Sequence, residues 1–297
     1  MTGDALVRSG GHGRTGGPPL PARSVGTAGG GGRGGDVGRA VSADGTPIAY
    51  ETWGEGPPAV VVGGALEDRR TGAGLGRALA ATGLRAVCYD RRGRGSSGDT
   101  RPYAVQREVE DLRAVLTAVG SGGPAFAHGA SSGGALLLTA VAQGLPVRRV
   151  SVLEPPYRTG GAPPLPEEFV ATLSALLAAG DRAGLVDHAR ARVPGLPDAV
   201  RGTPARDALL ELAPTLLYDA LVMGGEDQAL PRDTLARVGV PVLAVTSGGT
   251  ALPWLAGTAA EVAAAVPSGR CVRLEGGPHE VPPAVLAPAL AAFYRGG

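Results

Sequence analysis

The sequence predicts an α/β protein with a mostly parallel eight-stranded sheet, helices on both faces of the sheet and an inserted helical cap. Three observations support this prediction. Short apolar runs recur along the chain, helical patterns lie between them, and one long stretch near the middle has no strand character. Alternating strands and helices favour a parallel sheet, because each crossover helix returns the chain to the edge at which the next strand begins.

Eight short segments are predicted as strands, and several are apolar throughout, as in strands buried on both faces. They are residues 40–42, 47–53, 59–62, 85–89, 124–128, 149–153, 240–245 and 271–274. The first two flank an Asp44-Gly45 turn and are expected to form a hairpin. Helices are predicted at about 72–82 and from Val105 to Val119, where apolar residues recur every three or four positions.

The domain organisation follows from two interruptions of this pattern. Residues 1–38 are rich in glycine and arginine with few large apolar side chains, so we expect a disordered tail. Residues 155–239 hold three amphipathic patterns, at about 167–179, 182–192 and 205–222. Because strands resume afterwards, residues 155–239 are expected to form a cap over the carboxyl ends of the strands, where such sheets bind ligands. The core is then 39–154 and 240–297.

Ser131 lies in a Gly-x-Ser-x-Gly pattern between an apolar run and a helical pattern. In that context the pattern is typical of a nucleophile elbow, a sharp strand-to-helix turn that presents the serine hydroxyl. Gly129 and Gly133 provide the small residues that such a turn requires. Two alternatives stay open. A serine here can simply cap the following helix, and Ser132 is a rival nucleophile in a frame shifted by one, although only the Ser131 frame has glycine on both sides.

Five motifs occur in an order that resembles the α/β-hydrolase fold, from Val41 to the C-terminus. They are 61–66 (VVGGAL), 89–98 (YDRRGRGSSG), the elbow, 153–157 (LEPPY) and 274–280 (LEGGPHE). The second is similar to a turn of the esterase, peroxidase and meta-cleavage-product hydrolase branch. The resemblance implies an oxyanion hole made by the N–H groups of Ala65 and Ser132, with His279 as general base.

The acid that would orient His279 departs from the usual pattern. Most members of the family carry a carboxylate after the seventh strand, but residues 246–254 (TSGGTALPW) contain none, and Thr250 stands near that position. Some members carry the acid after the sixth strand, where this chain has Glu154. Because adjacent strands lie about 4.8 Å apart, Glu154 is able to serve His279 from there. Bracing of the double-proline turn that follows Glu154 is an equally good interpretation.

Other chemically notable residues have plainer interpretations. His128, within the strand before the elbow, is expected to be a core residue that points away from the site. The charged turn at 90–94 is expected to be salt-bridged and to hold the oxyanion loop, in preference to an electrostatic role near substrate. Five residues of the cap and its surroundings are candidates for core or for pocket lining: Tyr157, Phe169, Tyr218, Met223 and Trp254.

Three functions are compatible with these motifs. The first is a serine hydrolase of a small ester, thioester or lactone, in which Ser131 forms an acyl-enzyme, His279 transfers protons and Glu154 orients His279. The second is a non-hydrolytic enzyme on the same scaffold, a cyclase, lyase or acyltransferase of secondary metabolism, favoured by the missing strand-seven acid. The third is a binding protein that has lost the chemistry. The hydrolase mechanism requires no metal or organic cofactor, and the sequence signals none.

Composition limits the partners and the location. The formal net charge of +1 gives no reason to expect nucleic acid or a membrane surface, so the expected partner is a small-molecule substrate. Cys88 and Cys271 fall inside predicted strands and are expected to be buried. No apolar run approaches the roughly 20 residues that span a bilayer, and the N-terminus lacks the apolar core of a secretory signal. A cytoplasmic protein is the resulting expectation, and its oligomeric state is not predicted.

Overall fold

The computed structural model describes residues 35–120, 125–190 and 204–296. The expectations for most of the N-terminal tail, for Pro124 and for residues 191–192 lie outside these ranges. The tail boundary needs one correction, because the first strand begins at Asp36 and not near residue 40. Residues 36–38 pair with residues 50–52 of the second strand, so the hairpin register continues past the glycine at position 38.

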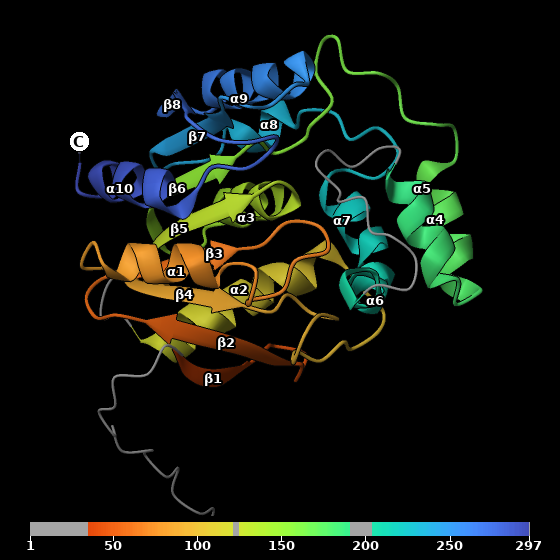
Figure 1. The fold of residues 1–297 in the computed structure, drawn as a ribbon, viewed down its shortest axis with the longest axis horizontal. Helices are drawn as coiled ribbons and strands as arrows, with labels where there is room; N and C mark the ends of the chain where they lie inside the picture. Colours follow the sequence, from red (N-terminus) through yellow and green to blue (C-terminus); the bar gives the residue numbers. More distant parts are fainter. Residues whose placement is uncertain (1–34, 121–124, 191–203, 297) are drawn as a thin grey trace, which may run out of the picture. The chain divides into compact units, whose positions relative to one another are not determined.

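The described strands form one sheet in the order β1-β2-β4-β3-β5-β6-β7-β8 (Figure 1). They are β1 Asp36–Val41, β2 Pro47–Trp53, β3 Pro58–Val62, β4 Arg85–Tyr89, β5 Ala125–Ala130, β6 Val147–Leu153, β7 Val242–Ser247 and β8 Gly269–Leu274. The β1–β2 and β2–β4 pairs are antiparallel, and the remaining pairs are parallel. The predicted mostly parallel sheet is confirmed, and each strand overlaps a predicted segment.

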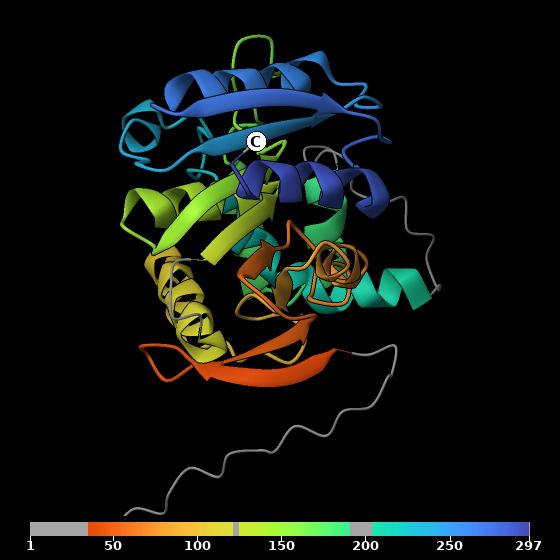
Figure 2. The ribbon, with the colours of Figure 1, turned by 90° about the vertical axis from the view of Figure 1, so that its left-hand side faces the viewer.

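Helices cover both faces of the sheet, as Figure 2 shows. On one face lie α2 Val105–Val119, α3 Ser132–Ala142 and α9 Pro253–Ala265, and on the other lie α1 Ala73–Ala80 and α10 Pro283–Tyr294. Each face has its own apolar cluster. Among the described helices, none combines the length and the apolar composition needed to cross a bilayer.

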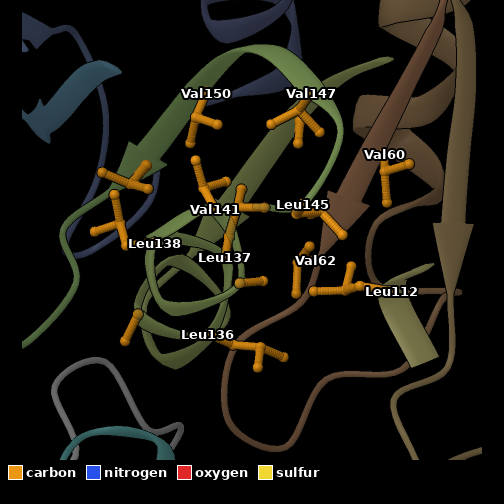
Figure 3. Close-up of a cluster of buried hydrophobic side chains, with 14 of the residues drawn as sticks. Val60, Val62, Leu112, Leu136, Leu137, Leu138, Val141, Leu145, Val147 and Val150 are labelled. Atoms are coloured by element: carbon orange, nitrogen blue, oxygen red, sulfur yellow. The ribbon is translucent and has the colours of Figure 1, made fainter. Parts of the chain in front are cut away.

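The helix that follows the elbow is held in the centre of the larger apolar cluster. Nine of its eleven residues are buried, and its leucines pack against Val60 and Val62 of β3, Leu112 of α2 and Val150 of β6 (Figure 3). A helix that is apolar on all sides is typical of a fully enclosed position. Because close-packed interiors resist displacement, α3 provides a rigid base for the turn at its N-terminus.

Five α-helices of the described residues are inserted between β6 and β7. They are α4 Phe169–Ala178, α5 Arg182–Arg190, α6 Pro204–Leu212, α7 Leu216–Val222 and α8 Arg232–Leu235, with a short 3-10 helix at Ala213–Thr215. The single long helix expected near 205–222 is divided at this 3-10 turn, because Pro214 has no N–H to continue an α-helix. The apolar cluster of these helices includes Leu66, so the inserted helices contact the loop that follows β3.

A buried ionic network joins the inserted helices to the rest of the fold. Asp219 of α7 accepts hydrogen bonds from Arg91 and Arg94, both in the turn after β4, at 2.7 Å each. Arg91 also donates two hydrogen bonds to the buried Glu108 of α2. Burial raises the pKa of Asp219, but the charges of Arg94 and Arg91 outweigh it and hold that pKa below its usual range.

The same turn supports the loop after β3, as the sequence predicted. Arg94 donates to the backbone oxygens of Gly64 and Glu67. Asp90 accepts hydrogen bonds from the backbone of Arg69 and of Ser96. Arg94 and Asp90 therefore hold the loop after β3 in place.

Replacing Asp219 with asparagine is expected to lower the free energy of unfolding by about 3–5 kcal/mol, because it leaves the buried charges of Arg91 and Arg94 partly uncompensated. Denaturant unfolding followed by circular dichroism measures this difference. The matched control is Asp227→Asn, on the exposed loop after α7, which is expected to stay within about 0.5 kcal/mol of wild type. Equal stability of the two variants would contradict the assigned role of the network.

The two cysteines differ in burial, and one expectation is wrong. Cys88 is buried in β4, as predicted, but Cys271 is exposed. Cys271 lies in β8, which is the last strand of the sheet, and most of its residues are exposed or half-buried. The short apolar pattern of this strand therefore indicates a strand that pairs with β7, but not one that is buried on both faces.

Candidate active site

The turn between β5 and α3 places Ser131 in a strained conformation. Its backbone has φ 51° and ψ −125°, which is unusual for a residue other than glycine. The turn is held by hydrogen bonds from Ser131 N to Leu153 O at 2.8 Å and from Gly134 N to Ser131 O at 2.9 Å. The Ser131 side chain makes no capping hydrogen bond to α3. The geometry is that of a nucleophile elbow and excludes the simple helix cap.

Both glycines that flank Ser131 are required by close backbone contacts. A Cβ atom at Gly129 would lie 2.6 Å from Gly133 O, and one at Gly133 would lie 2.4 Å from Val62 O. Any larger residue at either position would force the backbones of β3, β5 and α3 apart. The predicted need for small residues on both sides of the serine is therefore confirmed.

Ser131 and Ser132 have different surroundings. The Ser132 hydroxyl is buried and donates to Asp219 Oδ1 at 2.7 Å, while Arg91 donates to it at 3.3 Å. Ser131 borders a cavity, and its hydroxyl makes no hydrogen bond within the part of the chain that the structure describes. Of the two hydroxyls, that of Ser131 is the one without a hydrogen-bond partner in the described part of the chain.

The structure brings together two residues that the sequence separates by more than a hundred positions. Glu154 follows β6, His279 lies in the loop after β8, and Glu154 Oε2 is 2.7 Å from His279 Nδ1. Because a carboxylate only accepts hydrogen bonds, Nδ1 carries the proton of this bond. The other ring nitrogen, Nε2, is then left to accept a proton when the ring is neutral.

Glu154 is fully buried and is held by further hydrogen bonds to its second oxygen. Oε1 accepts from the Thr250 hydroxyl at 2.7 Å, from Ser247 N at 2.8 Å and from the Thr246 hydroxyl at 2.9 Å. Burial raises the pKa of Glu154, but the hydrogen bonds, led by that from His279, outweigh it and lower the pKa. The side chain is therefore ionised and fixed in orientation.

Thr250 stands where most members of the family carry the acid. Its hydroxyl donates to Glu154 and accepts a hydrogen bond from the backbone N–H of His279 at 3.2 Å. Glu154 reaches the same place from the neighbouring strand, because β6 and β7 are adjacent, with Leu153 opposite Val245. A hydroxyl after the seventh strand thus supports a carboxylate after the sixth.

Two backbone N–H groups near Ser131 have no hydrogen-bond partner in the part of the chain that the structure describes. Within the described residues, neither Ala65 N nor Ser132 N donates a hydrogen bond. Ala65 and Ser131 border the same cavities. A Cβ atom at Gly64 would lie 3.1 Å from Ser131 Cβ, so a larger residue here would push the loop or the serine by a few tenths of an ångström. Unpaired donors of this kind suit the charge that develops on an attacked carbonyl oxygen.

Ser131 stands where two cavities meet. The larger, of about 450 Å³, extends between α1 and α10 and is bordered by Ser131, His279 and Ala65. The smaller, of about 40 Å³, lies under the inserted helices. Its apolar lining includes three of the pocket candidates, Phe169, Met223 and Trp254. No hydrogen bond joins Ser131 to His279 among the described residues, although both border the larger cavity.

The expectation that His128 is a core residue is confirmed, but the expectation that it points away from the site is wrong. The residue is buried in the core, where Nδ1 contacts the Ser151 hydroxyl at 2.9 Å. It does not point away from the site, because it borders the same cavity as Ser131. His128 and Ala130 project from one face of β5, and the cavity descends along this face below the elbow.

His128 makes stability depend on pH. Burial lowers its pKa from 6.5 to about 4, so between these values the unfolded chain binds more protons and the free energy of unfolding falls as pH falls. Between about pH 7.5 and about pH 5 the loss from this group is about 2 kcal/mol. Denaturant unfolding of His128→Asn, which cannot titrate, is expected to show a correspondingly smaller loss than wild type. Equal losses in the two proteins would contradict this assignment.

Backbone strain gathers at the site. Six residues other than glycine have positive φ among those described, and four of them are Leu66, Ser131, Glu154 and His279. Such conformations persist only where the surrounding structure enforces them, and they occur often at functional sites. These four residues follow β3, β5, β6 and β8, so each of the four segments that form the candidate site contains a strained residue.

Sequence reasoning did not find Glu67. This side chain borders the larger cavity and accepts a hydrogen bond from Gly64 N at 2.6 Å. The only signal in the sequence is a carboxylate three residues after the glycine pair, which by itself is not distinctive. The hydrogen bonds that Thr246 and Ser247 donate to Glu154 were not predicted either.

The comparisons with known proteins agree with this fold. A family model described as "Alpha/beta hydrolase family" matches residues 70–292. An alpha/beta hydrolase from Sphaerobacter thermophilus DSM 20745 is 43% identical, with a TM-score of 0.79, covering 86% of this chain and 100% of the other. A comparison with curated protein sequences gave no match. The chain belongs to the alpha/beta hydrolase family.

More distant solved structures share the fold alone. A malate-bound thermophilic esterase from Thermogutta terrifontis is 20% identical with a TM-score of 0.66, and it covers 88% of this chain and 97% of its own. The enol-lactonase from Burkholderia xenovorans LB400 is 21% identical with a TM-score of 0.63, covering 87% of this chain and 97% of its own. At these identities the likeness concerns the arrangement of strands and helices.

Proposed function

We propose that this protein is a serine hydrolase that cleaves a small ester, thioester or lactone through an acyl-enzyme on Ser131. The observation that carries the proposal is the 2.7 Å hydrogen bond between buried Glu154 and His279, which borders the same cavity as the serine of the elbow, Ser131. Such a chain of carboxylate, imidazole and hydroxyl is the arrangement that activates serine in this class of enzyme.

In the first half of the reaction, Ser131 Oγ attacks the carbonyl carbon while His279 Nε2 takes the hydroxyl proton. The carbonyl oxygen becomes an oxyanion, which accepts hydrogen bonds from the N–H groups of Ala65 and Ser132. The tetrahedral intermediate then breaks its bond to the leaving oxygen or sulfur. His279 returns the proton to that atom, and the acyl group remains on Ser131.

In the second half, water enters beside His279 and attacks the acyl carbon as Nε2 takes one of its protons. The intermediate expels Ser131 Oγ, which recovers the proton from His279, and the carboxylic acid leaves. Glu154 keeps Nδ1 protonated throughout and stabilises the imidazolium that forms twice in each cycle. The hydrogen bond between serine and histidine is commonly long in unliganded enzymes and tightens when substrate binds.

The inserted helices, residues 155–239, act in this proposal as a cap that forms part of the substrate site. Support comes from the smaller cavity, to which Phe169, Leu173 and Met223 contribute an apolar lining next to Ser131. An apolar lining with few polar groups is typical of sites for small organic ligands.

The test is to trap the acyl-enzyme. The protein is mixed with p-nitrophenyl acetate, quenched in acid at increasing times and measured by intact-mass analysis. The expected result is release of p-nitrophenol with a mass increase of one acetyl group that disappears as substrate is consumed. Turnover of the ester without any acetylated protein at the earliest times would contradict the proposed mechanism and favour chemistry without covalent attachment.

A further inference from the structure

Glu67 is a carboxyl group in the larger cavity that the mechanism above does not use. It lies in the loop after β3, three residues beyond Gly64, and its Oε2 accepts the Gly64 N–H at 2.6 Å. A Cβ atom at Gly63 would lie 3.1 Å from the same oxygen. The side chain therefore folds back over the glycine pair, next to the loop segment that carries the Ala65 amide.

The second oxygen of Glu67 is open to the cavity. Within the described residues, Oε1 makes no hydrogen bond, and it is not among the fully buried side-chain atoms that lack one. Glu67 borders the cavity together with Ser131 and His279. Burial raises the pKa of Glu67, against the hydrogen bond from Gly64 and the charges of Arg94 and His279. A partly desolvated carboxyl with a free oxygen is well suited to bind a donor from a ligand.

The two cavities suit the two halves of an ester substrate, its acyl group and its leaving group. His279 returns its proton to the leaving atom, so the leaving group lies beside His279, and only the larger of these two cavities borders that residue. The smaller cavity, of about 40 Å³, has room for about three groups the size of a water molecule. A short acyl chain fits there, and the leaving group occupies the cavity that contains Glu67.

We propose that Glu67 is a specificity-determining residue that binds a hydrogen-bond donor on the leaving group, a hydroxyl or an ammonium. The preferred substrate is then an ester of a short acid with an alcohol that carries such a donor. This inference rests on the proposed serine hydrolase function, because the assignment of the leaving group to the larger cavity follows from proton transfer by His279.

The variant Glu67→Gln separates binding from loop support. Its amide oxygen can still accept the Gly64 N–H, but the free position then holds an NH₂ group, which cannot accept a hydrogen bond. Three acetate esters of similar size are compared: propyl acetate, 2-hydroxyethyl acetate and 2-(dimethylamino)ethyl acetate, the last protonated near neutral pH. Acid release in a pH-stat gives kcat and KM for each. The matched control is Glu55→Gln, an exposed residue between β2 and β3.

The expected result is a wild-type preference for a donor-bearing ester over propyl acetate that falls about 10- to 100-fold in Glu67→Gln. The loss is expected in KM, since binding of a remote group acts on ground state and transition state alike. A larger loss for the amine ester identifies a cationic alcohol, and a loss confined to the hydroxyl ester identifies a neutral one. Glu55→Gln is expected to keep the wild-type preference.

An equal loss in kcat for all three esters would overturn the inference, because it would mean that Glu67 only positions the oxyanion loop. An unchanged preference would overturn it as well. Labelling of wild type and Glu67→Gln with a fluorophosphonate keeps this failure distinct from failure of the proposed function. If both proteins are labelled, the hydrolase mechanism stands whatever the preference. If wild type is not labelled, the proposed function itself fails.

Discussion

Ser131→Ala is expected to lower kcat for ester hydrolysis on the order of 10⁶-fold, which is the scale of loss when the nucleophile of a serine hydrolase is removed. Ser131 borders both cavities and its hydroxyl makes no hydrogen bond among the described residues, whereas the Ser132 hydroxyl is bound to Asp219. Alanine fits the turn, since a Cβ atom is already present there. The fold is therefore expected to be retained, which circular dichroism and thermal unfolding check. Steady-state kinetics with p-nitrophenyl acetate measures the loss.

Ser132→Ala is the matched control. Its hydroxyl is bound to Asp219, and its expected contribution to the reaction is the backbone N–H, which alanine also provides. This variant is expected to keep the acyl-enzyme and turnover. If Ser132→Ala were inactive and Ser131→Ala active, the frame of the elbow would be wrong, and Ser132 would be the nucleophile.

Glu154→Gln is expected to lower kcat about 10⁴-fold, the effect of replacing the orienting carboxylate in a serine protease by an amide. The amide removes the negative charge that stabilises the His279 imidazolium. Glutamine also presents an N–H group to His279 Nδ1, which favours the wrong ring tautomer. Single-turnover acylation by p-nitrophenyl acetate measures the effect on the chemical step directly.

Thr250→Val is the matched control for Glu154→Gln. It removes one of the four hydrogen bonds that Glu154 accepts and keeps the carboxylate beside His279. A much smaller loss than that of Glu154→Gln is expected. Similar losses of kcat in the two variants would indicate that catalysis depends on the hydrogen bonds of this loop and not on the charge of Glu154. That result would contradict the role proposed for Glu154.

The fold was largely predictable because its signals are local. Buried parallel strands are short apolar runs, and α2 shows an apolar face at helical spacing. The errors arise where tertiary context decides. Cys271 is exposed because β8 is an edge strand, and the sequence does not state which strand lies at the edge. The start of β1 was missed because its pairing with β2 extends over a glycine-rich segment.

The site was predictable to the extent that turn chemistry marks it. Glycines on both sides of Ser131 and the glycine-rich loop before His279 leave a pattern in the sequence, because those backbones need small residues. Whether Glu154 contacts His279 or braces its own loop was not decidable from residue types. In the structure one oxygen accepts from His279 and the other from the end of β7 and the loop after it, and among the described residues the side chain makes no hydrogen bond to the double-proline turn.

Glu67 and His128 show what residue types alone do not reveal. Glu67 borders the larger cavity because its loop folds back over the glycine pair, and His128 borders it because the cavity extends along β5. Neither belongs to a motif with a fixed spacing. Their positions depend on packing between β3, α1 and α10, which involves segments far apart in the sequence.

The measurement that most directly tests the central claim is the site of reaction with a fluorophosphonate probe, located by peptide mass analysis after intact-mass measurement. We predict one adduct per chain, on Ser131, formed much more slowly in Glu154→Gln and absent in Ser131→Ala. No adduct on the folded wild-type protein, or an adduct on any residue other than Ser131, would contradict it.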